Sequence, residues 1–333
     1  MAVRPADAGS VEHVPVLYQS VLEWLQPRPG TRFVDGTLGG GGHAEGILQS
    51  GAQVLGLDRD EEALRTAARR LAPFGGRAIC RHGCYREAPE ILREIGWNAV
   101  EGIVLDLGLS SLQLADPQRG FAFREDGPLD MRFDRSGGET AADLVNTLPE
   151  TEIAGILFRY GEERDARRIA RAMVQRRPIE STRQLADVVA DAAGRRRSGR
   201  DRLHPATRTF QALRIAVNRE LDELEQGLPD LMECLKEGGR IAVISFHSLE
   251  DRIVKRTFRR AAGKPIRGED RGPGMEAAAR FRELTGKPVQ PAASEMTANP
   301  RSRSAKLRVL ERIRTAGPTG GAETSGAGRG KMR

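Results

Sequence analysis

The chain of 333 residues is predicted to adopt an α/β fold, in which a Rossmann-like parallel sheet is interrupted by an inserted, mainly helical domain. The first observation is that short apolar runs alternate with amphipathic segments over residues 31–107, which is typical of a doubly wound sheet. These runs are flanked by glycine, as expected for parallel strands buried on both faces. The second observation is that the alternation resumes only at 240–246, after a long stretch with helical patterning. We therefore expect one sheet built from two separated segments.

The first segment contains four predicted strands with helices between them. We expect strands at residues 31–36, 52–58, 77–82 and 99–107, and helices at 43–50, 60–72 and 87–95. The alternation stops after Leu107, and Gly108 to Gly138 is predicted to be a loop because it is rich in Gly, Pro, Asp and Arg. From about Ala141 to Ala193 the pattern is helical, and Ser181 with Gln184 can form a capping box.

A long amphipathic helix is predicted to begin near His204-Pro205. Its apolar residues recur at steps of three and four, at Phe210, Leu213, Val217, Leu221 and Leu224. Gly238-Gly239 interrupts this pattern before a buried strand at Arg240–Phe246, and a last strand is expected at 305–313. The predicted domains are the sheet domain at 11–114 and 206–315, the insert at 115–205, and disordered tails at 1–10 and 316–333.

Composition and charge narrow the class of protein. No apolar run approaches the roughly 18 residues that span a membrane, and the N-terminus lacks a signal-peptide pattern, so we expect a cytoplasmic protein without a membrane partner. Three cysteines without paired spacing indicate neither a disulfide framework nor a zinc site. The net charge is +7, and between Arg159 and Arg214 there are 15 arginines, no lysine and seven acids. This excess favours a nucleic-acid surface over a merely solvated helix face.

The most informative motif follows the first predicted strand. That strand ends in Asp35, and six glycines fall within the next eleven residues, where a predicted helix begins near His43. Consecutive glycines suit a place where the backbone approaches a ligand closely. A short glycine run is also typical of a flexible linker. The strand before this run and the helix after it favour the ligand-binding loop.

A second strand ends in Asp58, 23 residues after Asp35, close to the spacing at which a mononucleotide-binding unit places an acid against ribose hydroxyls. Asp60 can cap the following helix, which leaves Asp58 free for a ligand. Gly39-x-Gly41-x-x-Ala44 matches a dinucleotide fingerprint, but that fingerprint binds a pyrophosphate and calls for no acid such as Asp35. S-adenosylmethionine (SAM) carries an ammonium and a sulfonium instead, and it is therefore the favoured cofactor.

Polar residues stand at the ends of four predicted strands, at Asp35, Asp58, Asp106 and Ser245. The ligand of an open parallel sheet lies outside the carboxyl ends of its strands, so we expect these four residues to mark the site. Taken alone, His43, Tyr85 and His247 would be interpreted more simply, as a helix-end residue, a core aromatic residue and a packed histidine.

Eight longer segments together resemble the RsmH (MraW) family of bacterial methyltransferases. The segments are Asp35–His43, Asp106–Gln113, Arg119–Phe123, Gly127–Arg132, Tyr160–Glu163, His204–Arg214, Ser245–Arg252 and Asn299–Arg308. Members of this family transfer a methyl group from SAM to the N4 amine of a cytosine, 1402 in standard rRNA numbering, in the decoding region of 16S rRNA. The resemblance spans about residues 12 to 313 and implies a methyltransferase fold with a helical insert.

By motif, the resemblance implies SAM contacts at Gly41, Gly42, His43, Asp58, Tyr85, Asp106 and Gln113. Backbone N–H groups would serve the amino-acid end of SAM, a carboxylate its ribose, an aromatic face its adenine, and an amide its orientation. The chain departs from the family pattern at Tyr85, where Phe is common, and at Leu112, where Pro is often found. Tyrosine keeps the stacking face.

The exocyclic amine of cytosine is a poor nucleophile because its lone pair is delocalised into the ring, so an acceptor must hold the N–H and take its proton. The Pro-Pro-aromatic platform that many amino methyltransferases carry after this strand is absent from Asp106-Leu-Gly-Leu. We hypothesise that Asp106 orients the reacting groups, with Asp130 or His247 as proton acceptor. A loop-capping carboxylate is an equally good interpretation of Asp106. The chemistry requires no metal.

The expected partner is 16S rRNA within the small ribosomal subunit. The candidate RNA-facing element is the basic loop of the insert, with Arg195, Arg196, Arg197, Arg200 and Arg202. Two other classes share part of the pattern. A nucleotide-dependent oxidoreductase would bind NAD rather than SAM, and a noncatalytic RNA-binding or assembly factor would bind 16S RNA without transferring a methyl group.

Overall fold

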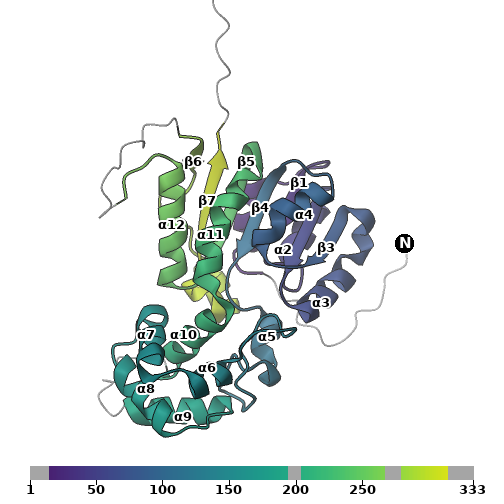
Figure 1. Ribbon diagram of the computed structural model, residues 1–333. Coiled ribbons are helices and arrows are strands. Elements are labelled where there is room, and N and C mark those ends of the chain that lie inside the picture. The colour runs from purple at the N-terminus through teal and green to yellow at the C-terminus, as the bar shows by residue number, and fades with distance from the viewer. Residues whose placement is uncertain (1–14, 194–203, 267–278, 314–333) are drawn as a thin grey trace, which may run out of the picture.

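The structure is a computed structural model that describes residues 15–193, 204–266 and 279–313, and a seven-stranded sheet forms its centre (Figure 1). The strands are β1 (Arg32–Asp35), β2 (Gln53–Asp58), β3 (Ala78–His82), β4 (Val100–Asp106), β5 (Leu235–Ser245), β6 (Phe281–Glu283) and β7 (Lys306–Arg312). Their order is β3-β2-β1-β4-β5-β7-β6. Strands β1 to β5 pair in parallel, and β7 runs antiparallel to both neighbours. The predicted strands are all present, and β6 is a short addition.

Helices cover both faces of this sheet. On one face, α1 (Tyr18–Leu25), α2 (Gly42–Gln49) and α3 (Glu61–Leu71) share an apolar core that includes Phe33 of β1. On the other face, α4 (Ala88–Glu94), α11 (Glu220–Glu233) and α12 (Ser248–Ala261) share a core that includes Val34. Successive residues of a strand point to opposite faces, so β1 is buried on both sides. This double burial is why the strand segments appear as uninterrupted apolar runs.

The carboxyl ends of β1, β2 and β4 meet at one edge of the sheet. β1 pairs with β2 on one side and with β4 on the other. From β1 the chain first adds β2 and β3 towards one edge of the sheet, and it then returns to add β4 and β5 towards the other edge. The resulting topological switch point is where open α/β sheets bind ligands. The insert lies below this edge in Figure 1.

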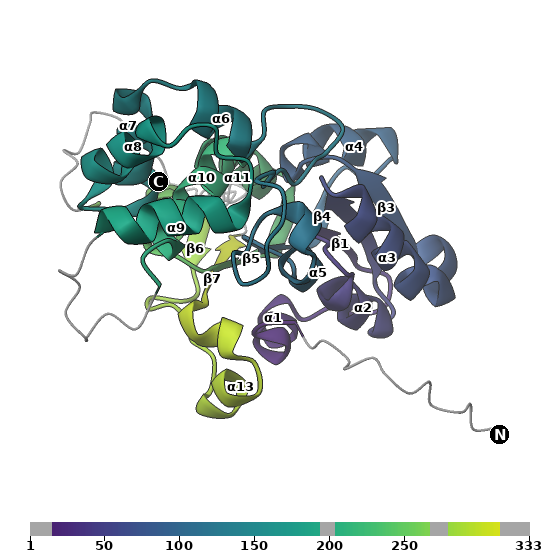
Figure 2. The same ribbon diagram turned by 90° about the horizontal axis from the view of Figure 1, so that it is seen from below.

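The insert is a group of helices with a core of its own. Within the predicted limits of 115–205 it contains α6 (Ala141–Thr147), α7 (Glu150–Gly161), α8 (Ala166–Gln175) and α9 (Thr182–Ala193), seen from below in Figure 2. Helices α5 (Ser111–Ala115) and α10 (Thr207–Asn218) flank these limits. Ser181 N–H donates to Gln184 Oε1 at 3.2 Å and Gln184 N–H to Ser181 Oγ at 3.3 Å, which confirms the predicted capping box. Phe210 and Leu213 of α10 pack into this core. The domain limits themselves stay a prediction.

Two expectations about the second segment were wrong. The single long helix is instead α10 and α11, separated by Arg219, whose φ of 52° is left-handed. Apolar spacing of three and four continues across this break, so periodicity could not reveal it. Gly238-Gly239 lies inside β5 rather than before it, at the irregularity where Leu235 pairs with Val100 and Arg240 with Gly102.

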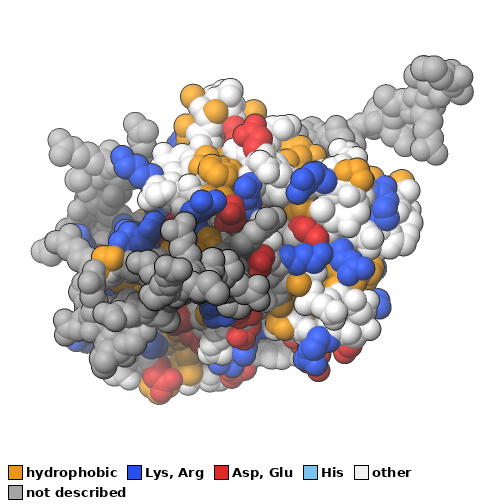
Figure 3. Space-filling view, turned by 90° about the horizontal axis from the view of Figure 1, so that it is seen from above, with side chains coloured by type: hydrophobic (Ala, Val, Ile, Leu, Met, Phe, Trp, Pro, Cys, Tyr) orange, Lys and Arg blue, Asp and Glu red, His pale blue; other side chains and the backbone are white. Residues whose placement is uncertain are grey.

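The remaining elements are short. Helix α13 (Ala293–Ala298) lies beside α1 (Figure 2), where Leu17 N–H donates to Glu295 Oε1 at 2.7 Å. Short 3₁₀ segments occur at Ala72–Arg77, Tyr85–Glu87, Pro117–Arg119 and Pro300–Ser304, and the first is kinked at Gly75. On the face away from the insert, Lys and Arg side chains lie among Asp and Glu (Figure 3). Within the described ranges no helix is both long and apolar enough to cross a membrane.

Candidate functional site

A cleft of about 340 Å³ lies at the switch point of the sheet. The glycine loop and the ends of β2 and β4 line one side of it, and Phe133, Glu220 and Glu223 line another. Of the predicted site residues, the following line this cleft: Gly42, His43, Asp58, Tyr85, Asp106 and Gln113. The structure therefore brings together residues that are as much as 71 positions apart in the sequence.

The glycine loop is shaped by close contacts and by one open position. A Cβ on Gly42 would lie 2.4 Å from Pro15 Cγ, and Gly41, at φ 81°, faces Ala67 of α3 rather than the cleft. Gly40 lines the cleft, and a Cβ there would meet no atom within 4 Å. The loop thus presents bare backbone to the cleft at Gly40, as a closely bound ligand requires.

Asp58 anchors this loop. Its Oδ2 accepts a hydrogen bond from Gly39 N–H at 2.7 Å, and its Oδ1 accepts from Asp60 N–H at 2.9 Å. Burial raises the pKa of Asp58, and these backbone donors oppose that shift. Asp60 caps α3 by accepting from Glu62 N–H at 3.0 Å, as predicted. Each carboxylate oxygen has a second lone pair, so Asp58 can still accept from the hydroxyls of a ligand.

Tyr85 forms an apolar wall of the cleft. Its side chain is 9% exposed and packs against Gly36 and Gly227, where a Cβ would lie 2.8 Å and 3.1 Å from the tyrosine side chain. Burial, reinforced by nearby acids such as Glu223, raises the pKa of the phenol well above its usual value. The ring is therefore neutral and held in place, which suits stacking against a flat ligand.

His43 and Asp106 form the polar centre of the cleft. His43 Nε2 lies 3.7 Å from Asp106 Oδ2, and the ring is 5% exposed. Both ring nitrogens of His43 and Oδ1 of Asp106 are buried without a hydrogen-bond partner. Buried polar groups without partners are costly, so these atoms indicate a place for polar groups of a ligand. Asp106 N–H donates to Thr37 Oγ1 at 2.6 Å, which fixes the strand end.

Two of the four strand-end residues do not reach the cleft wall. Asp35 is 1% exposed beneath the loop, and burial raises its pKa to about 7 although His43 opposes this. Ser245 is 2% exposed and lies against the backbone of β7, with Oγ 3.5 Å from Lys306 O. Asp35 therefore does not face the ligand directly, contrary to the expectation from its position after β1.

Gln113 lines the cleft, but its amide is already used within the protein. Its Oε1 accepts from Ser110 N–H at 3.0 Å, and its Nε2 donates to Asp60 Oδ2 at 2.9 Å. A second N–H of Nε2 and a second lone pair of Oε1 remain, so direct contact with SAM stays a prediction. Gln113 also caps α5 and joins this helix to the N-terminus of α3.

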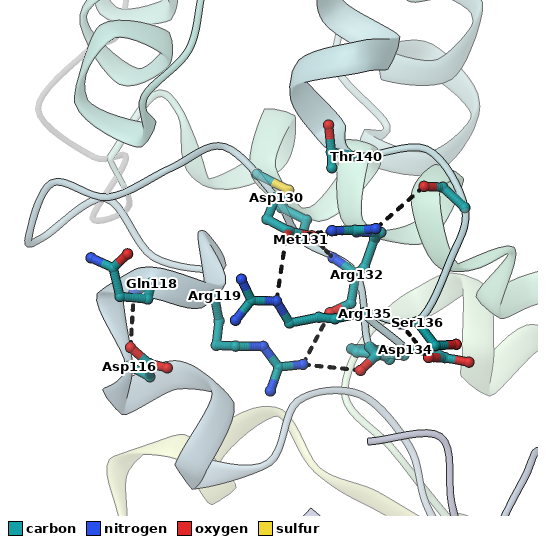
Figure 4. A network of polar contacts seen from close by, with 12 residues as sticks. Asp116, Gln118, Arg119, Asp130, Met131, Arg132, Asp134, Arg135, Ser136 and Thr140 are labelled. Carbon is teal, nitrogen blue, oxygen red and sulfur yellow. Dashed lines mark hydrogen bonds and ion pairs between the residues drawn. The ribbon is translucent and has the colours of Figure 1, made fainter. Parts of the chain in front are cut away.

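Asp130 and His247 lie away from the cleft lining. Asp130 receives three hydrogen bonds from Arg132, from the backbone N–H at 3.0 Å, from Nε at 2.8 Å and from a terminal guanidinium nitrogen at 3.0 Å, and Arg135 Nε lies 3.6 Å from Asp130 Oδ2 (Figure 4). His247 is the N-cap of α12, where Nδ1 accepts from Glu250 N–H at 3.4 Å and Nε2 lies 3.0 Å from Glu250 Oε1. Asp130 is thus paired with two arginines and His247 lies against Glu250, and neither residue lines the cleft.

Several cleft residues escaped the sequence analysis. Glu220 follows the left-handed break at Arg219, and its carboxylate receives two hydrogen bonds from Arg214, at 2.8 Å and 2.9 Å. Glu250 accepts from Phe246 N–H at 2.8 Å and holds that residue at the cleft. Glu250 could have been found in the sequence, because it belongs to the Ser245–Arg252 motif. Glu220 belongs to no motif, and the sequence analysis placed it inside one continuous helix.

A glycine loop at a strand-to-helix turn, with carboxylates at the switch point of a parallel sheet, defines a Rossmann-like protein with a site for a small-molecule cofactor. The chain belongs to the MraW methylase family, whose model matches residues 10–313. It is 53% identical over 314 residues to ribosomal RNA small subunit methyltransferase H of Geobacter sp., covering 90% of this chain and 98% of the relative. The protein of the same name from Syntrophotalea carbinolica is 52% identical over 317 residues, with 91% and 98% covered. Membership in a methylase family confirms the resemblance and excludes the oxidoreductase alternative.

Proposed function

We propose that this protein is a SAM-dependent methyltransferase of small-subunit ribosomal RNA that modifies the N4 amine of cytosine 1402. The observation that carries the proposal is the pair of His43 and Asp106, whose buried polar atoms have no protein partner in a cleft between sheet and insert. The names of the relatives support the RNA class of the substrate. The resemblance of the motifs to the family supports cytosine as the target base and its N4 as the methylated atom.

The residues of the cleft fit SAM. Gly40 and Gly42 offer bare backbone to its amino-acid end, and Asp58 offers carboxylate lone pairs to its ribose hydroxyls. Tyr85 supplies a neutral aromatic face for adenine. The cleft lining contains five acids, Asp58, Asp106, Glu220, Glu223 and Glu250, and three arginines, Arg59, Arg70 and Arg301. This excess of acids suits a ligand that carries a sulfonium and an ammonium.

When bound, SAM supplies a methyl group whose carbon–sulfur bond breaks as the nitrogen–carbon bond forms, with the bonding electrons leaving on sulfur. Asp106 lines this cleft at the end of β4, and its carboxylate can hold an N–H of the target amine. It also accepts the proton that the amine loses on methylation. His43 lies beside this carboxylate, with Nε2 3.7 Å from Oδ2. Asp106 thereby replaces Asp130 and His247 as the proposed proton acceptor.

The target base must leave its stack to reach this cleft, because the reacting amine has to approach Asp106. The insert stands beside the cleft and contributes Phe133 to its wall. The arginines predicted to face RNA, Arg195, Arg196, Arg197, Arg200 and Arg202, lie outside the described residues. They stay the proposed phosphate contacts, and the assembled small subunit stays the proposed substrate.

The test is methylation of 30S subunits from cells that lack this chain, with free 16S RNA in parallel and labelled SAM as donor. We expect mass mapping to locate one N4-methylcytosine at position 1402. Asp106→Asn should lower single-turnover methylation at saturating SAM by about 100-fold or more, since it removes a proton acceptor. The matched control is Asp230→Asn on an exposed position of α11. RNA binding without label transfer would favour the noncatalytic alternative, and equal rates for Asp106→Asn would refute the role of Asp106.

A further inference from the structure

One buried guanidinium joins the sheet domain to the insert beside the cleft. Arg119 is 3% exposed, and it belongs to a short 3₁₀ turn in the loop that follows α5. A buried arginine is rare unless its charge is paired. Both terminal nitrogens of Arg119 have hydrogen-bond partners, whereas its buried Nε has none. The partners of Arg119 lie on two different elements, and both elements contribute residues to the cleft.

On the side of the sheet, Arg119 pairs with the residue that supports the proposed ribose acid. A terminal guanidinium nitrogen of Arg119 donates to Asp60 Oδ2 at 2.5 Å, and Gln113 Nε2 donates to the same oxygen at 2.9 Å. Asp60 N–H in turn donates to Asp58 Oδ1 at 2.9 Å. The direction of the Asp58 carboxylate therefore depends on where Arg119 and Gln113 hold Asp60.

On the side of the insert, the second terminal nitrogen of Arg119 donates to two backbone carbonyls, those of Arg132 and Phe133, each at 3.0 Å. Figure 4 shows Arg119 pointing at this segment, while Arg132 and Arg135 converge on Asp130. Phe133 lines the cleft. Its backbone segment is thus held against the same guanidinium that holds Asp60.

Asn218, at the end of α10, holds the same segment through two further hydrogen bonds. Its Oδ1 accepts from Phe133 N–H and its Nδ2 donates to Met131 O, both at 2.7 Å. Met131 has a φ of 65°, a conformation that a non-glycine residue keeps only when its surroundings impose it. The side chains of Arg119 and Asn218 therefore fix the position of the segment that carries Phe133 at the cleft.

We propose that Arg119 is a positioning residue that sets the separation between the ribose-binding Asp58 and the Phe133 wall, against which the target nucleotide docks. This inference rests on the proposed function. Methyl transfer requires donor and amine to be aligned closely, and a displacement of about 1 Å can cost a hundredfold in rate. Only arginine supplies donors in a fixed fork that reaches a carboxylate and two carbonyls together.

The test uses Arg119→Lys, which keeps the charge beside Asp60 but cannot also reach both carbonyls. We expect the affinity for S-adenosylhomocysteine, measured by calorimetry, to stay within about threefold of the wild type. We expect kcat on 30S subunits to fall by about 10- to 100-fold. Asn218→Ala, which loosens the same segment without touching the buried charge, should show the same split between cofactor affinity and rate. The matched control is Arg93→Lys on an exposed position of α4.

Two results would overturn the proposal. One is wild-type kcat in both Arg119→Lys and Asn218→Ala. The other is a loss of cofactor affinity and thermal stability that parallels the loss of rate in both variants, because that pattern belongs to a residue that only supports the fold. Affinity for 30S subunits is measured beside the rate. If the wild-type protein binds subunits without methylating them, the proposed function is refuted. In that case subunit affinity decides the positioning role: weaker binding by Arg119→Lys supports it, and unchanged binding refutes it.

Discussion

Replacing Gly40 by alanine tests whether the cofactor packs directly on the glycine loop. An added Cβ at Gly40 would meet no protein atom within 4 Å, and the backbone there is not in the left-handed region. The protein should therefore fold with unchanged stability. The methyl group would occupy cleft space that a ligand needs, and overpacking costs about 1–3 kcal/mol. At about 1.4 kcal/mol for each factor of ten, the affinity should fall about 5- to 150-fold.

The assay is calorimetric titration with S-adenosylhomocysteine, together with a thermal melt of the free protein. Gly286→Ala is the matched control, because a Cβ there also meets nothing within 4 Å and the position lies outside the cleft lining. Gly42→Ala gives the contrast, since its Cβ would lie 2.4 Å from Pro15 Cγ and should destabilise the free protein. Wild-type affinity for Gly40→Ala would refute the placement of the cofactor against this loop.

Three further predictions concern stability and RNA binding. Burial raises the pKa of Asp35 from 3.8 to about 7, so the folded state keeps a proton that the unfolded chain loses. Stability should fall between about pH 4 and pH 7, by on the order of 4 kcal/mol, and thermal melts of Asp35→Asn should lack this slope. Arg219→Gly should stabilise the protein by about 1 kcal/mol in urea unfolding, because glycine adopts a φ of 52° without strain. Subunit affinity should fall steeply with salt while S-adenosylhomocysteine affinity changes little, and parallel losses would contradict an RNA-facing role for residues 194–202.

The strands could be predicted because each is determined by its own residues. In β1, Phe33 and Val34 are apolar because each enters the core on one face of the sheet. In the loop that follows, Gly42 leaves no room for a Cβ beside Pro15, and Gly40 presents bare backbone to the cleft. Asp60 was predicted as a helix cap for the same reason, since its partner Glu62 is two residues away. Local patterns of this kind carry their own physical cause.

The partners that the motifs could not indicate lie far away in the sequence. Gln113 was expected to bind the cofactor, yet its amide is held by Ser110 and by Asp60, 53 positions away. Asp130 was expected to accept a proton, yet it is held by two arginines. A motif shows that a polar residue is needed at a position, and it does not show which group that residue binds.

The sequence by itself determined the α/β class, the insert, the glycine loop and the family, because hydrophobic patterning, turn chemistry and long motifs are properties of short segments. Only the tertiary structure decided which polar groups stand at the cleft without a hydrogen-bond partner in the protein. His43 and Asp106 are 63 positions apart, and they meet with unpartnered atoms because β1 and β4 are neighbours in the sheet. Arg119 meets both Asp60 and the segment at Phe133 because the insert folds back over the strand ends. Hydrogen-bond partners are chosen by proximity in space, and proximity is set by the packing of the whole chain.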